Sequence, residues 1–250
     1  RQTNRQQTMT TPAPATPLLA TSARFWNKVA RKYAAAAIAD MPGYEHTLQR
    51  VRQRLQPTDR VLELGCGTAT TALRLAPATA HYTAADLSPA MVDIARQKLA
   101  DAPPAVQHTL HLVVADADAH LPAPGRQAPN GPADPSAGTA HPGWDVVLAF
   151  NLLHLVPDLD HTLAHAARHL RPGGLFICKT PCIAHMNPLV PYVALPVLRL
   201  LRFIPPIQVL TEDRLLTAIE RSGLTIDCVE HHATSPRGRD WRPFVVARKP

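Results

Sequence analysis

Short apolar runs alternate with amphipathic segments from about residue 60 onward, and this alternation sets the expected architecture. Strands are predicted for the apolar runs at 60–64, 81–85, 110–115, 144–153 and 175–179. Helices are predicted for the amphipathic segments at 68–76, 89–100, 159–170 and 211–223. Because strands and helices take turns along the chain, the pattern indicates a parallel sheet. The last two strands, 224–230 and 243–249, have no helix between them and are expected to pair antiparallel or through a long excursion.

The flanks of this pattern are less regular. Two helices, 22–41 and 44–55, precede the first strand, and residues 1–21 are expected to form a disordered tail. Residues 1–8 precede the first methionine, Met9, and are expected to be upstream sequence. We therefore expect a single domain over residues 22–250.

Two insertions interrupt the pattern. Residues 121–143 are rich in proline and glycine and have almost no large apolar side chains, so we expect a mobile insertion there. Residues 182–210 are apolar and broken by prolines.

The stretch "RVLELGCGTAT", residues 60–70, runs from a strand into a glycine turn. A P-loop does not fit, because no lysine follows Gly65 at the required spacing. A dinucleotide-binding turn is disfavoured, because Thr70 stands where the G-x-G-x-x-G motif has its third glycine. This alternative remains open. Glu63 sets this turn apart, because it places a carboxylate at the end of the strand.

Three acidic residues follow three successive strands, namely Glu63, Asp86 and Asp116. A carboxylate at Glu63 suits the ammonium and sulfonium of S-adenosylmethionine. Asp86 suits the two ribose hydroxyls of either S-adenosylmethionine or NAD. Asp116 suits the amino group of adenine. Since the ends of parallel strands share one edge of a sheet, the three acids are expected to line one nucleoside-binding cleft.

The glycine turn, the strand-end acids and the antiparallel tail together resemble the class I S-adenosylmethionine-dependent methyltransferases. The resemblance rests on "LELGCGTAT", "AADLSPAM", "VVADADAHLP", "DVVLAFNLLHLV" and "LRPGGLFICKTP", and extends from about residue 24 onward. It implies an α/β, Rossmann-like fold with a seven-stranded, mostly parallel sheet, an antiparallel last strand and helices on both faces. It also implies S-adenosylmethionine as the cofactor.

Carried over by position, the resemblance implies a set of cofactor contacts. They are Tyr33, Glu63, Gly65, Cys66, Gly67, Asp86, Leu87, Met91, Asp116, Ala117, Asn151 and Leu152. Tyr33 is expected to cover the cofactor, although a helix-surface aromatic is the alternative. Ala69 replaces the family's third glycine. His154 is the nearest candidate for a catalytic base, and a buried structural histidine is its alternative.

Histidines at 161, 165 and 169 recur every four residues, opposite the apolar stripe of their helix. We expect this row to face solvent and to hold no metal, because it lacks a carboxylate or cysteine partner.

Four cysteines, at 66, 178, 182 and 228, lack metal-ligand spacing and are expected to be reduced core thiols in a cytoplasmic protein. No run of residues is long and apolar enough to suggest a membrane helix.

The identity of the methyl acceptor is the feature that the sequence determines least. Residues 182–210, with Arg199 and Arg202, favour a cap over a small lipophilic or aromatic molecule, taken from a membrane surface. A dimer or core helix is the alternative, which leaves the oligomeric state open.

The net charge of +7 permits an RNA substrate, but "FNLLH" replaces the Asn/Asp-Pro-Pro-aromatic turn typical of base-amine methyltransferases. An NAD-dependent reductase and a catalytically silent binding module are further alternatives.

Overall fold

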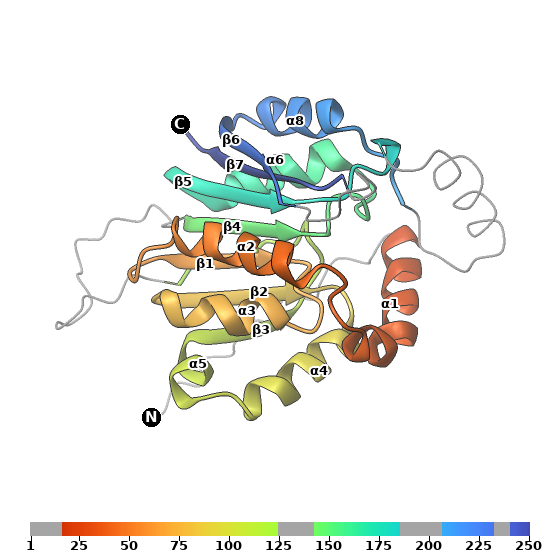
Figure 1. Ribbon diagram of the computed structural model, residues 1–250, viewed down its shortest axis with the longest axis vertical. Coiled ribbons are helices and arrows are strands. Elements are labelled where there is room, and N and C mark those ends of the chain that lie inside the picture. Colours follow the sequence, from red (N-terminus) through yellow and green to blue (C-terminus); the bar gives the residue numbers. More distant parts are fainter. Residues whose placement is uncertain (1–16, 125–142, 186–206, 233–240) are drawn as a thin grey trace, which may run out of the picture.

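The computed structural model describes residues 17–124, 143–185, 207–232 and 241–250. Its centre is a seven-stranded sheet in the order β3-β2-β1-β4-β5-β7-β6 (Figure 1). The strands are β1 (Arg60–Leu64), β2 (His81–Asp86), β3 (Leu110–Val114), β4 (Trp144–Phe150), β5 (Leu170–Lys179), β6 (Thr225–His231) and β7 (Pro243–Arg248). Strands β1 to β5 pair in parallel, and β7 runs antiparallel to β5 and β6. The predicted fold class is therefore confirmed.

Helices cover both faces of this sheet. They are α1 (Pro17–Ala35), α2 (Met41–Arg52), α3 (Thr70–Leu75), α4 (Pro89–Ala100), α5 (Pro104–Thr109), α6 (Leu159–His169) and α8 (Glu212–Arg221), with short 3₁₀ turns at Ala76–Ala78 and Ile183–His185. Buried residues of α2, α3, α4 and α5 share one core cluster with the sheet, and those of α6 and α8 share the other.

Alternation along β1 explains the two cores. Val61 packs towards the α2 and α3 side, whereas Leu62 and Leu64 pack towards α6 and α8. Glu63 points to the same side as Val61, where it meets the hydroxyl of Tyr82. Both faces of β1 are buried, as expected for a central parallel strand.

Local signals in the sequence set several helix ends as predicted. The hydroxyl of Ser88 accepts a hydrogen bond from the Met91 amide at 3.2 Å, at the start of α4. The hydroxyl of Thr211 accepts from the Arg214 amide at 3.1 Å, at the start of α8. Gly223, with φ of 88°, follows the end of α8.

The amino-terminal boundaries differ from the predicted ones. Helix α1 begins at Pro17, so residues 17–21 are helical rather than part of a disordered tail. Helix α2 begins at Met41 and includes Gly43, because the Asp40 carboxylate accepts a hydrogen bond from the Gly43 amide at 3.0 Å. Residues 1–16 lie outside the described residues.

Differences also occur further along the chain. Helix α5 was not predicted, and β5 begins at Leu170 and includes residues 171–174, five residues earlier than the predicted strand at 175–179. Residue Leu121, predicted to begin the mobile insertion, packs against the core, and its carbonyl accepts a hydrogen bond from the Trp144 indole at 2.7 Å. Residues 125–142 of that insertion, and 186–206 of the expected cap, lie outside the described residues.

The order of the strands locates a cleft. The chain moves outward from β1 to β2 and β3, then returns to β4 on the other side of β1. Loops leaving β1 and β4 therefore diverge at the carboxyl edge of the sheet, where open α/β sheets bind ligands. Helix α1 lies across this edge (Figure 1).

Candidate functional site

A cavity opens at the carboxyl edge between β1 and β4, beneath α1. Its wall is built from α1, the glycine turn, the ends of β2 and β3, and the loop after β4. The lining residues are Leu19, Ser22, Trp26, Tyr33, Gly65, Gly67, Asp86, Leu87, Met91, Ala115, Asp116, Ala117, Asp118, Phe150, Asn151, Leu152, Leu155, Val156, Pro157 and Thr162. Most of the predicted cofactor contacts are thus brought together in one place.

The glycine turn has a left-handed backbone at three alternate positions. Gly65, Gly67 and Ala69 have φ of 68°, 55° and 57°. A Cβ on Gly65 would lie 2.7 Å from Cδ1 of Leu152, so glycine is required there for space as well as for conformation. Ala69 adopts the conformation that a glycine would favour, at a cost of about 1 kcal/mol. It begins α3 without a side-chain cap.

Asp86 holds the turn from the next strand. Its Oδ2 accepts a hydrogen bond from the Gly67 amide at 2.8 Å, and its Oδ1 accepts from the Ser88 amide at 2.9 Å. Burial raises the pKa of Asp86, and these two amide bonds oppose that rise. Each carboxylate oxygen keeps a free lone pair, so Asp86 can also accept hydrogen bonds from a ligand in the cavity.

Two further acids lie at the other end of the cavity. The Oδ1 of Asp116 accepts a hydrogen bond from the Asp118 amide at 2.7 Å, which closes the turn after β3. The Oδ2 of Asp118 lies 3.2 Å from Nδ1 of His161, whereas its Oδ1 is buried without a partner among the described residues. Together with Asp86, these acids make the cavity attractive to a cation, although the chain as a whole carries +7.

Helix α1 covers the cavity with one of its faces. Leu19, Ser22, Trp26 and Tyr33 share a helical face, and the rings of Trp26 and Tyr33 meet edge to face at 6.0 Å. Asn27 fastens the helix to α4, because its Oδ1 accepts hydrogen bonds from the Ser88 hydroxyl at 2.7 Å and the Ala90 amide at 3.1 Å. Helix α1, which covers the cavity, is therefore hydrogen-bonded to the start of α4.

Glu63 and Cys66 do not line the cavity. The side chain of Glu63 lies behind the turn, 2% exposed, with its Oε2 accepting a hydrogen bond from the Tyr82 hydroxyl at 2.8 Å. Burial raises the pKa of Glu63 to about 8. A cation bound at the turn would favour the ionised form of this carboxyl. Cys66 is also buried, which raises the pKa of its thiol.

His154 also lies outside the cavity wall, after Leu152 and Leu153 on the loop that follows β4. Burial, with a smaller effect from Arg242, lowers its pKa to about 4. Its Nδ1 is buried and has no partner within the described part of the chain. The ring is therefore neutral at physiological pH and has an unused polar atom.

The histidine row on α6 is only partly as predicted. His161 is exposed, but His169 is 7% exposed and its Nε2 accepts a hydrogen bond from the Leu121 amide at 3.0 Å. The expectation that all three histidines face solvent was wrong for His169, because the start of the 121–143 segment covers it. All four cysteines are free thiols, as predicted, and Cys66, Cys178 and Cys182 are buried. Cys228 is only partly buried, so the expectation of a core thiol was wrong there.

Sequence reasoning missed part of the cavity wall. The wall also contains Leu19, Ser22 and Trp26, which precede Tyr33 on the same helix. Successive members of this series are three, four and seven residues apart, which is the spacing of one helical face. Following the helical face that carries Tyr33 towards the amino terminus of α1 would have identified these three residues. Asp118 and Thr162 carried no comparable signal, because α6 approaches the β3 loop only in the folded chain.

The fold and the cavity define a nucleoside-cofactor protein of the class I methyltransferase type, with a glycine turn, an acid at the end of β2 and a reversed β7. Residues 62–176 match the family model described as a methyltransferase domain. The matched region is thus a methyltransferase domain of the class I type, which uses S-adenosylmethionine as its cofactor.

Two curated relatives illustrate the range of the family. The chain is 29% identical over 151 residues to a highly reducing polyketide synthase of Leptosphaeria maculans, covering 57% of this chain and 5% of that one. It is 33% identical over 142 residues to ribosomal RNA small subunit methyltransferase A of Thermobifida fusca, covering 53% and 46%. The match thus spans less than half the length of either relative.

Solved structures are similar over nearly the whole chain. A [4+2]-cyclase has a TM-score of 0.65 at 16% identity, with 95% of this chain and 98% of that one covered. Geranyl diphosphate C-methyltransferase from Streptomyces coelicolor has a TM-score of 0.63 at 15% identity, with 96% and 100% covered. At these identities the similarity establishes the shared fold.

Across the described segments, none of the helices combines the length and apolar character needed to span a bilayer.

Proposed function

We propose that the chain transfers a methyl group from S-adenosylmethionine to a small, mainly apolar acceptor. The observation that carries this proposal is the number of large apolar side chains in the cavity lining. Leu19 and Trp26 from α1 line the cavity, as do Phe150, Leu155 and Val156 from the end of β4 and the loop after it. An apolar wall of this kind binds lipophilic or aromatic molecules.

Exposed apolar side chains beyond the cavity support the same acceptor class. Met41 is 45% exposed and Trp241 is 37% exposed. The described end of the 182–210 segment reaches this region, since the Gln208 amide donates to the His154 carbonyl at 2.7 Å. The relatives named for polyketide synthesis and geranyl diphosphate methylation are consistent with such an acceptor.

Within the donor site we propose a role for each acid. Asp86 binds the ribose hydroxyls, Asp116 accepts from the adenine amino group with Ala117 beside it, and Glu63 favours the ammonium through its charge. Tyr33 covers the cofactor. Asn151, with φ of 53° and its amide donating to the Lys179 carbonyl at 2.8 Å, and Leu152 close the cleft. When bound, S-adenosylmethionine supplies a methyl group on a sulfonium; the protein aligns the acceptor with it and excludes water.

We retain His154 as the proposed base. Its neutral ring can accept a proton, but a pKa of about 4 makes it weak, so it suits an acceptor that is already acidic. A histidine with this pKa does not change its protonation state between pH 6 and pH 8, so His154 should cause no change in methyl-transfer rate over that range. His154→Gln then lowers turnover by roughly 10²-fold without changing cofactor affinity.

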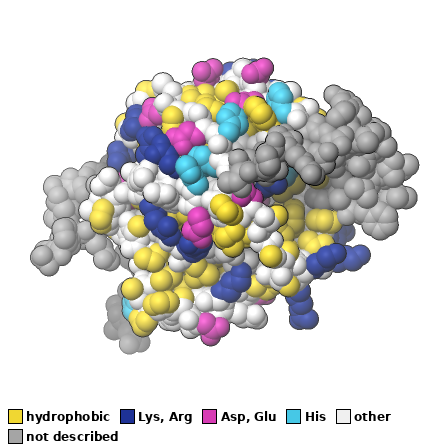
Figure 2. Space-filling model, viewed as in Figure 1, with side chains coloured by type: hydrophobic (Ala, Val, Ile, Leu, Met, Phe, Trp, Pro, Cys, Tyr) yellow, Lys and Arg dark blue, Asp and Glu magenta, His cyan; other side chains and the backbone are white. Residues whose placement is uncertain are grey.

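An RNA acceptor is the second candidate. It is favoured by the net charge of +7 and by the similarity to a ribosomal RNA methyltransferase. On the face shown in Figure 2, however, lysine and arginine side chains are interspersed with acids and form no continuous patch. A basic stripe is the usual footprint of nucleic-acid binding.

The test is a transfer assay with S-adenosylmethionine labelled on its methyl group. Quinones, phenols, fatty acids and total RNA are offered separately, and organic-phase and RNA-bound label are counted. The proposal expects label in an apolar small molecule, abolished by Asp86→Ala. Label found in RNA alone, falling steeply as salt is raised, would favour the second candidate instead.

A further inference from the structure

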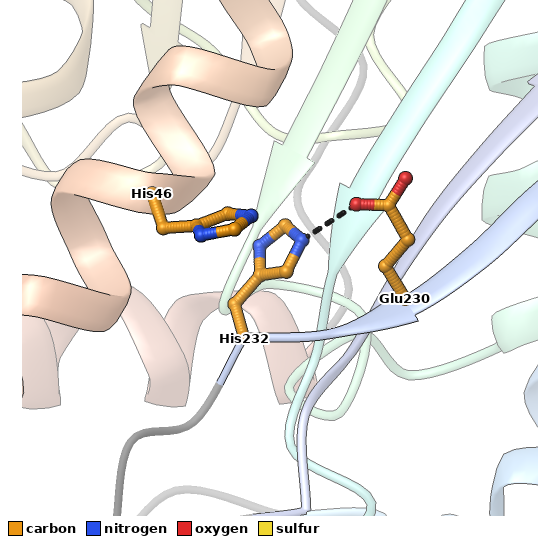
Figure 3. Close-up of side chains that lie close together, drawn as sticks. All are labelled: His46, Glu230 and His232. Carbon is orange, nitrogen blue, oxygen red and sulfur yellow. Dashed lines mark hydrogen bonds and ion pairs between the residues drawn. The ribbon is translucent and has the colours of Figure 1, made fainter.

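Three side chains that ligate metals meet where α2 packs beside the end of β6. They are His46 from α2, Glu230 near the end of β6 and His232 just after it (Figure 3). One ligand atom from each lies within 4.8 Å of the others. None of the three lines the cofactor cavity. The cluster is therefore separate from the donor site and has no role in the function proposed above.

The proton arrangement of His232 follows from its neighbour Thr47. The Thr47 hydroxyl donates its proton to the Gly43 carbonyl at 2.7 Å, so its oxygen can only accept from Nδ1 of His232, 3.0 Å away. Lys179 donates to the same oxygen at 2.8 Å. Nδ1 of His232 thus carries the hydrogen, and Nε2 of the neutral ring presents a lone pair.

That lone pair points at another acceptor. Nε2 of His232 lies 2.9 Å from Oε2 of Glu230 (Figure 3). Arg50 forms a two-pronged ion pair with the same carboxylate, its Nε donating to Oε2 at 2.8 Å. The ion pair keeps Glu230 ionised, so a lone pair and a carboxylate oxygen face each other. A cation between them removes the repulsion.

We infer that His46, Glu230 and His232 form a binding site for a divalent transition-metal ion of the zinc type. Two imidazoles and one carboxylate are a known zinc ligand set that leaves a fourth position open. Adjacent ligand atoms of a tetrahedral site with metal bonds of about 2.1 Å lie about 3.4 Å apart, so the 2.9 Å between Nε2 and Oε2 has to widen by about 0.5 Å to admit the ion. The ion takes the place of a proton between His232 and Glu230.

The surroundings of the cluster match those of a metal ligand set. Thr47 fixes the ring of His232, and Arg50 fixes the carboxylate of Glu230, as outer partners orient ligands in metal sites. His46 is exposed and its ring lies 4.5 Å from that of His232, which provides a route for the ion. Lys179 and Arg50 are positively charged and weaken binding, so the site suits a strongly bound ion such as Zn²⁺ over Mg²⁺ or Ca²⁺.

Calorimetry with zinc chloride on the full chain tests this inference, using protein without a histidine tag and freed of metal by a chelator. Wild type is expected to bind about one equivalent, and Co²⁺ is expected to give a visible absorption band. His46→Ala and His232→Ala are expected to weaken binding by roughly tenfold or more. His108→Ala, an exposed histidine on α5, is the matched control and is expected to bind as wild type does.

Two results would overturn the inference. One is a wild-type chain that gives neither zinc heat nor a cobalt band, which would mean that a proton alone bridges His232 and Glu230. The other is zinc binding that both variants leave unchanged. If His232→Ala fails to fold, His46→Ala decides alone, because His46 is exposed and its loss leaves the buried hydrogen bonds of His232 and Thr47 in place.

Discussion

The donor and acceptor sides of the carboxyl edge are built in different ways. On the donor side, after β1, β2 and β3, backbone amides and carboxylates are locked together, as in the bonds from Gly67 and Ser88 to Asp86. On the proposed acceptor side, after β4, the wall includes the apolar side chains of Phe150, Leu155 and Val156. His154 lies outside this wall on the same loop, and its Nδ1 has no partner within the described residues.

This difference shows which features a cofactor requires and an acceptor does not. A shared cofactor needs glycines and acids at set positions, because its ribose and adenine are the same in every relative. An acceptor needs only an apolar surface of suitable shape, which many sequences can provide. Variants of the donor side should therefore change cofactor affinity, and variants elsewhere should spare it.

The largest effect is expected from Asp86→Ala. This variant removes the proposed ribose contacts and the hydrogen bond that holds Gly67, each worth about 1.5 to 3 kcal/mol. Affinity for S-adenosylhomocysteine should fall by roughly two orders of magnitude or more, measured by calorimetry. Asp93→Ala, an exposed acid on α4, is the control. A change of less than about threefold in Asp86→Ala would place the ribose elsewhere.

Glu63→Gln should alter the pH dependence of stability. The pKa of Glu63 is raised to about 8, above its unfolded value, so the native state holds a proton that the unfolded state loses. Its contribution is complete below about pH 4.5 and is lost as pH rises through 8, a change on the order of 5 kcal/mol.

Thermal unfolding of Glu63→Gln at pH 5 and pH 9 checks this prediction. The variant keeps an acceptor for the Tyr82 hydroxyl and should gain stability relative to wild type as the pH increases. Glu220→Gln, an exposed acid on α8, should show no such trend. Parallel curves for wild type and Glu63→Gln would mean that Glu63 is already ionised at pH 5.

Gly65→Ala should lower both stability and cofactor affinity. The new Cβ would sit 2.7 Å from Leu152 at a φ of 68°, for a cost of about 1 to 2 kcal/mol and roughly tenfold in affinity. Gly223→Ala is the matched variant, because Gly223 has φ of 88° but nothing within 4 Å of its Cβ position. It should lose stability alone. Equal cofactor affinities in the two variants would contradict the assignment of the turn.

The smallest effect is expected from Asn27→Ala. This variant removes the acceptor that joins α1 to Ser88 and Ala90, worth about 1 kcal/mol, so cofactor affinity should fall by roughly fivefold. Lys28→Ala, an exposed neighbour on the same helix, is the control. An unchanged dissociation rate for S-adenosylhomocysteine in Asn27→Ala would show that α1 does not retain the cofactor.

Sequence patterns predicted those parts of the molecule that depend on nearby residues. The turn at Gly65 and the alternation of strands and helices are of this kind, because each is set within a few residues or by a regular period. The pattern failed where distant segments meet. His169 is buried because Leu121 lies on it, and Glu63 is shielded from the cavity by the turn it was expected to serve. The cluster of His46 and His232 was missed for the same reason.

Hydrogen exchange of the amides, with and without S-adenosylhomocysteine, tests the central claim most directly. The claim is that the donor side and α1 form one cofactor site, separate from the rest of the carboxyl edge. Slower exchange is expected in α1, residues 65–70, residues 86–91 and residues 115–118, with no change at the end of β6. Protection at the end of β6, or none in α1 and the glycine turn, would contradict the account.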